Sequence, residues 1–133
     1  MLFVALATLP TVSNAFAENS CDPAKGVTMV GDADAPWTMQ IELNPTEVPL
    51  NLPFDADVTV CFLSDNLATR ITVDATMPAH KHGMNYQPKT TRTGDVSYKA
   101  TNLLFHMSGM WRLEVTAYGM GKPYRFTHDV DLR

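Results

Sequence analysis

Short runs in which apolar and polar residues alternate recur along the chain, separated by Pro, Gly, Asn and Asp. Because successive side chains of a β-strand point to opposite faces, such a run buries one face and exposes the other. In the run TRITVDA, Ile71, Val73 and Ala75 form the apolar face, and Thr72 and Asp74 form the polar one. Stretches with a helical period are hard to find. The pattern therefore predicts an all-β protein.

About seven strands are expected, at residues 27–30, 37–43, 57–63, 69–75, 96–105, 110–118 and 123–132. The alternation in the fifth strand breaks near Thr101 and Asn102. The Pro-rich stretch 44–54 is interpreted as an irregular connection, since proline cannot donate to a sheet. Residues 119–123 are interpreted as a hairpin connection. Strands with this spacing are typical of an antiparallel β-sandwich of two sheets with an immunoglobulin-like outline.

The length of 133 residues fits one domain. The formal net charge of -4 and the absence of a basic patch argue against a nucleic-acid partner.

The opening sequence MLFVALATLPTVSNAFA is uncharged and apolar, and it ends in a small-x-small pattern. It predicts a signal peptide at 1–17, cleaved after Ala17, and an exported, periplasmic domain at 18–133. The usual positive n-region is missing. A membrane anchor is the alternative, although Pro10 and Asn14 interrupt the short apolar run.

Cys21 and Cys61 are the only cysteines. In an exported chain they are expected to form a disulfide. Cys61 lies on the opposite strand face from Val58 and Val60, so the bridge should hold the N-terminal tail against an outer surface. The alternative is that both cysteines bind copper.

The chain lacks the signatures of common enzymes. It has no G-x-S-x-G elbow and no Gly-rich phosphate loop. A zinc- or copper-dependent enzyme would need an acid or base beside the metal, and Asp74 and Asp95 are the only nearby candidates. We therefore expect that the protein is not an enzyme.

The stretch MPAHKHGMNY places Met77, His80, His82 and Met84 in a loop after a strand. Core packing does not explain this composition. Thioether sulfur suits Cu(I), and imidazole suits copper in either oxidation state as well as zinc. In an extended segment His80 and His82 point to the same side, and Gly83 lets the chain bend towards Met84.

A second cluster, FHMSGMW, supplies His106, Met107 and Met110 in a turn between two strands. If both loops lie at one end of the sandwich, their side chains meet and form a metal site. The spacing matches no strong zinc signature. The other Met and His residues are interpreted as packing or turn residues: Met29, Met39, Met120 and His128.

The C-terminal half resembles the YtkA-like domain family in its MP-x-x-x-HGM loop, its following Pro and Gly, and its F-x-M-x-G-x-W-x-L-x-V run. The matching positions are Met77, Pro78, His82, Gly83, Met84, Pro88, Gly94, Phe105, Met107, Gly109, Trp111, Leu113 and Val115. The resemblance implies an exported or membrane-tethered immunoglobulin-like sandwich, often found beside copper-handling and respiratory-oxidase assembly systems. It implies Met77, His82, Met84 and Met107 as functional residues. The residues themselves add His80, His106 and Met110.

The sequence thus predicts a periplasmic copper chaperone or buffer that holds Cu(I), Cu(II) or both. Expected partners are the copper ion, a copper-accepting or oxidase-assembly protein, and a second copy of the chain in a homodimer. The alternative is a metal-free interaction module whose loop methionines form an adaptable apolar patch for a partner protein.

Overall fold

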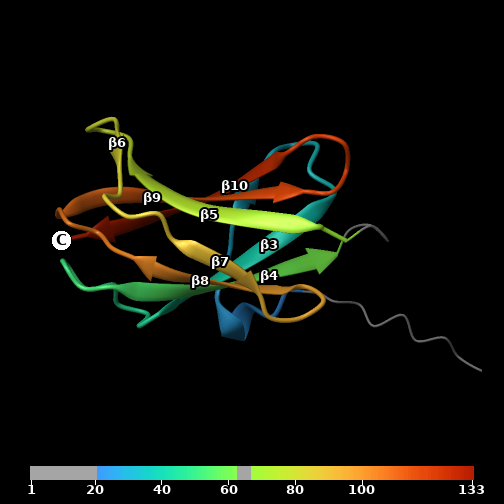
Figure 1. The fold of residues 1–133 in the computed structure, drawn as a ribbon, viewed down its shortest axis with the longest axis horizontal. Helices are drawn as coiled ribbons and strands as arrows, with labels where there is room; N and C mark the ends of the chain where they lie inside the picture. Colours follow the sequence, from blue (N-terminus) through green and yellow to red (C-terminus); the bar gives the residue numbers. More distant parts are fainter. Residues whose placement is uncertain (1–20, 63–66) are drawn as a thin grey trace, which may run out of the picture.

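The computed structural model describes residues 21–62 and 67–133, so the predicted signal peptide lies outside the described residues. Two five-stranded antiparallel sheets pack as two layers (Figure 1). One sheet contains β1 (Val27–Thr28), β3 (Trp37–Asn44), β4 (Phe54–Phe62), β8 (Ser97–Leu103) and β7 (Lys89–Arg92), in that spatial order. The other contains β2 (Val30–Gly31), β10 (Tyr124–Leu132), β9 (Gly109–Tyr118), β5 (Arg70–Met77) and β6 (His82–Gly83). The all-β prediction is confirmed, with ten described strands instead of seven.

The predicted alternation places the core between the sheets. Along β5 every second residue from Ile71 to Met77 is buried, and along β9 the same holds from Trp111 to Ala117. The largest fully buried side chains come from both layers: Trp37, Trp111, Phe54, Phe105 and Phe126. Burying one side chain of this kind contributes about 1.5–3 kcal/mol, so these layers account for much of the stability.

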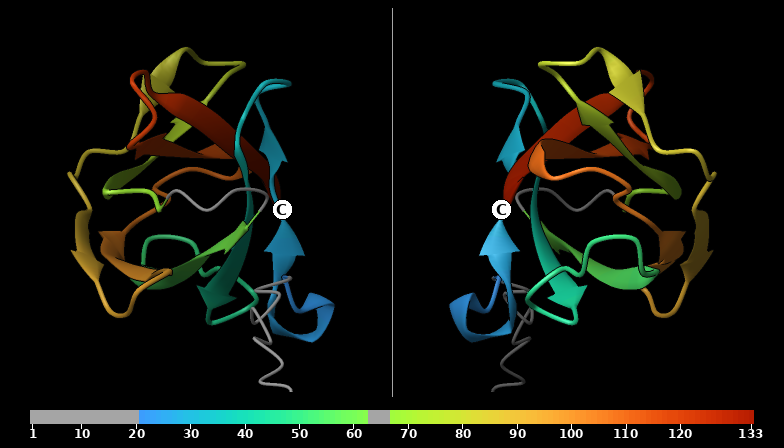
Figure 2. Two further views of the ribbon diagram at one scale, coloured as in Figure 1. Left: turned by 90° about the vertical axis from the view of Figure 1, so that its right-hand side faces the viewer. Right: turned by 90° about the vertical axis from the view of Figure 1, so that its left-hand side faces the viewer.

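The predicted first strand divides between the two sheets. Val27 in β1 lies opposite Ile41 of β3, whereas Val30 in β2 lies opposite Thr127 of β10. Met29, between them, is buried and donates its N–H to the carbonyl of Met39 at 2.8 Å. Figure 2 shows this segment running along one side of the sandwich from one layer to the other. It borders both sheets.

Two strands were not expected from the sequence. β6 has only two residues, and β7 consists of KTTR, which contains no apolar residue. Both are the last strand at an edge of their sheet. Apolar alternation indicates a strand that covers the core, so short or polar edge strands give no such pattern.

The predicted break in β8 is a β-bulge. Phe54 lies opposite Leu103 and Ala56 lies opposite Ala100, so Asp55 faces two residues of β8. One of these, Asn102, has a φ of 65°. An extra residue of this kind reverses the parity of the strand, as the sequence indicated.

The predicted disulfide is present, with 5.3 Å between the Cα atoms of Cys21 and Cys61. It holds the N-terminal segment, including the short helix η1 (Pro23–Lys25), against the outer face of β3 and β4. Gln40 is buried beneath this segment and exchanges hydrogen bonds with the backbone of Asp22. Neither described cysteine is free to bind copper. No helix in the described part of the chain is long and apolar enough to cross a bilayer.

Candidate metal centre at one end of the sandwich

The two predicted Met/His loops meet at one end of the sandwich, on the left in Figure 1. The ring centroids of His82 and His106, one from each loop, are 5.4 Å apart. The ring centroids of His80 and His82 are 5.7 Å apart. Because metal–nitrogen bonds are about 2.0–2.1 Å long, two imidazoles that share an ion have centroids roughly 4.5–6 Å apart. Both pairs are within this range.

A tight turn places the first loop. The carbonyl of Met77 accepts hydrogen bonds from the N–H groups of His80, at 3.1 Å, and Lys81, at 2.9 Å. Lys81 adopts a φ of 54°, which reverses the chain. β6 then runs back along β5 with His82 directly opposite Met77. Residues opposite each other in an antiparallel pair share a face, so the imidazole of His82 and the thioether of Met77 lie on the same side.

Trp111 forms the floor of the site. Its fully buried ring stacks on Phe105, with centroids 4.6 Å apart and an interplanar angle of 4°. The rings of His82 and His106 approach the indole edge to face, at 5.9 and 5.4 Å. The indole Nε1–H donates to the carbonyl of Met107 at 2.9 Å. Trp111 therefore fixes both imidazoles and the second loop.

The two central histidines differ in their polar surroundings. Nδ1 of His82 lies 3.1 Å from the carbonyl oxygen of Gly83. Nδ1 of His106 is buried and has no hydrogen-bond partner among the described residues. A buried polar atom without a partner is rare in folded proteins and calls for an explanation such as a bound ion. An unprotonated imidazole nitrogen is a suitable ligand for such an ion.

The predicted methionines occupy different environments. Met77 is only 1% exposed, and a Cβ built on Gly109 in the second loop would lie 2.9 Å from its methyl carbon. Met77 thus extends from β5 to the second loop. Met84 is half-buried against the core. Met107 and Met110 are both 37% exposed, and Met110 lies on the outer face of β9, away from the buried Trp111.

The structure therefore gathers Met77, His80, His82 and His106, with Met84 at the margin, and it turns Met110 to another face. Within residues 21–62 and 67–133, no group of three or more His, Cys, Asp or Glu side chains is arranged to hold a metal ion.

The Pro-rich connection, which carries two exposed leucines, was not expected to lie beside the candidate centre. Leu50, in the Pro-rich connection, forms an isolated bridge with Phe105, and the N–H of Asn51 donates to the Phe105 carbonyl at 2.9 Å. Leu50 and Leu52 are 45% and 59% exposed. The Pro-rich connection has no periodic pattern, so no signal in the sequence indicated where these side chains lie.

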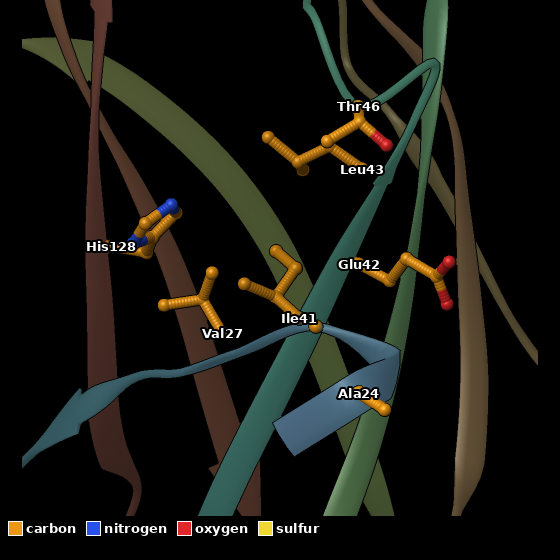
Figure 3. A pocket seen from close by; sticks show the side chains of 8 residues that line it. Ala24, Val27, Ile41, Glu42, Leu43, Thr46 and His128 are labelled. Carbon is orange, nitrogen blue, oxygen red and sulfur yellow. The ribbon is translucent and has the colours of Figure 1, made fainter. Parts of the chain in front are cut away.

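His128 lies elsewhere, on β10. Its ring borders a cavity of about 220 Å³ between the N-terminal segment and β3, beside Val27 and Ile41 (Figure 3). Burial lowers the pKa of His128 below its usual 6.5, and the charge of Asp129 partly opposes this shift. The cavity is smaller than the roughly 300–1,000 Å³ of typical ligand pockets, and none of the predicted ligands lines it. These surroundings suit the packing role predicted for His128.

No protein-family model matches this chain, and no curated protein or solved structure shows significant similarity to it. The resemblance to the YtkA-like family therefore stays a prediction.

Proposed function

We propose that this protein is an exported copper-binding protein, a periplasmic chaperone or buffer, that holds the ion between its two Met/His loops. The observation that carries the proposal is the 5.4 Å separation of His82 and His106 across the loops. Met77 adds a thioether on the same strand face as His82.

We also propose that the sandwich is immunoglobulin-like. The order β3-β4-β8-β7 in one sheet corresponds to strands A, B, E and D of that fold. The order β10-β9-β5-β6 in the other corresponds to G, F, C and C′. β1 and β2 are then an additional N-terminal strand. In this arrangement the candidate centre lies beside the C–C′ connection, where the chain leaves the sheet.

The ligand chemistry supports exchange of copper. A thioether is uncharged and forms no disulfide, so it stays a ligand where free thiols oxidise. Imidazole binds both Cu(I) and Cu(II). His82 is half-buried and His80 is exposed, which gives the ion a route to a copper-accepting or oxidase-assembly protein. Met84 and Met107 are further proposed ligands during this transfer, whereas Met110, on the outer face of β9, is not proposed as one.

The test is a titration of the mature protein with Cu(I) against a competing chelator, and with Cu(II) in parallel. The variant carries His82→Asn and His106→Asn, and the matched control carries His128→Asn. We expect stoichiometric binding that the double variant loses and the control keeps, with all three proteins folded by circular dichroism. Equal weak binding by all three would refute the copper function.

A second candidate function is a metal-free interaction module. Four large apolar side chains are each at least 37% exposed to solvent: Leu50, Leu52, Tyr86 and Met107. The bridge from Leu50 to Phe105 places part of this surface beside the second loop. Such a surface would lose its partner on Leu50→Ser with Leu52→Ser, while histidine substitutions would leave binding unchanged.

A further inference from the structure

We infer that the two central histidines bind copper through different ring nitrogens, His82 through Nε2 and His106 through Nδ1. This inference rests on the proposed copper function and deepens it by naming the donor atoms.

The donor atom of His82 follows from its contact with Gly83. Nδ1 of His82 lies 3.1 Å from the Gly83 carbonyl oxygen, which can only accept a hydrogen bond. Nδ1 therefore carries the proton in the neutral ring. The lone pair is left on Nε2, and a backbone carbonyl that holds Nδ1–H is the usual way in which proteins orient a metal-binding histidine.

The donor atom of His106 follows from a missing partner. Its Nδ1 is buried and has no hydrogen-bond partner among the described residues. A neutral imidazole carries one proton and one lone pair. With the proton on Nε2, Nδ1 holds an uncompensated lone pair inside the protein, and a metal ion would satisfy it.

Trp111 packs against both imidazoles and fixes the planes of their rings. Both imidazoles pack against its indole at interplanar angles of 72°, and Trp111 is itself held by Phe105 and by its bond to the Met107 carbonyl. Trp111 is thus a positioning residue. Because Nδ1 is the ring nitrogen nearer the main chain and is buried in His106, an ion held there would lie below the loop surface.

The test is nitrogen NMR of the imidazole rings in the ¹⁵N-labelled wild-type protein, before and after addition of Cu(I), which is diamagnetic. Single variants His80→Gln, His82→Gln and His106→Gln assign the signals. Without metal we expect the Nδ1–H form of His82 and the Nε2–H form of His106. With Cu(I) the nitrogens that shift should be His82 Nε2 and His106 Nδ1, and His80 should change less.

Three results would overturn the inference. If Cu(I) binds tightly but shifts Nε2 of both rings, the donor assignment is wrong and the copper function stands. If Cu(I) binds tightly and leaves His106 unchanged, the ion uses other ligands, and again only the inference fails. If chelator competition detects no binding, the copper function and the inference fail together.

Discussion

Replacing Met77 by leucine removes the thioether and keeps the volume of the side chain. Met77 is 1% exposed, so its packing and its sulfur both contribute at this position. A volume-conserving exchange in a core costs less than about 1.5 kcal/mol, whereas truncation to alanine costs about 2–5 kcal/mol. Met77→Leu should therefore stay folded, and Met77→Ala should show a much lower urea midpoint.

Copper affinity separates the two roles of Met77. Loss of a group that hydrogen-bonds to a metal ligand lowers metal affinity by about 10- to 100-fold, so loss of a direct ligand should lower it by at least about tenfold. Tenfold corresponds to about 1.4 kcal/mol. Met39→Leu is the matched control, because Met39 is also fully buried but belongs to β3 in the other sheet. Cu(I) competition and urea unfolding are measured on both leucine variants.

The expected result is a similar stability for the two leucine variants and weaker Cu(I) binding for Met77→Leu alone. If Met77→Leu binds Cu(I) as tightly as the wild type, the thioether is not a ligand. Met77 would then serve only to pack the core, and the centre would have to draw its sulfur from elsewhere.

Three further predictions concern stability. Replacing both cysteines by alanine removes a link between residues 40 positions apart, which should lower the free energy of unfolding by about 4 kcal/mol; an unchanged urea midpoint would contradict this. In Gly109→Ala the new Cβ would lie 2.9 Å from the methyl carbon of Met77, at a residue with a φ of +125°. Gly121→Ala is the control, because its φ is also positive, at +83°, but its new Cβ meets open space. Backbone strain costs about 1–3 kcal/mol, and we expect the lower melting temperature for Gly109→Ala; equal melting temperatures would exclude an effect of the contact. Because burial lowers the pKa of His128, its neutral form favours folding above about pH 6.5, and this stability is lost as the pH falls through the folded-state pKa. His128→Gln should reduce the change in the free energy of unfolding between pH 7 and pH 5. An unchanged pH dependence would argue against a lowered pKa of His128.

The strand faces could be predicted because alternation records which side of a strand meets the core. This holds for β5 and β9, whose inward residues are buried as expected. Alternation says nothing about what covers the outer face. Gln40 occupies a polar position and is still buried, because the disulfide holds the N-terminal segment over it.

The candidate site was predictable in composition but not in geometry. The sequence supplied both loops, and the sheet order brings His82 close to His106. Which methionine joins them depends on strand register, which places Met77 opposite His82 and turns Met110 outward. The packing of Trp111 against both imidazoles depends on tertiary structure, so the local sequence pattern does not predict it.

The N-terminal segment protects the edges of both sheets from pairing with another copy of the chain. β1 covers part of the edge of β3, and β2 covers part of the edge of β10. If this segment detached, both sheets would present unpaired backbone groups, which are templates for aggregation and for exchange of strands between molecules. The bridge at Cys21 lies just ahead of β1 and ties it to its own chain. Formation of this disulfide therefore keeps the strand from exchanging between two molecules.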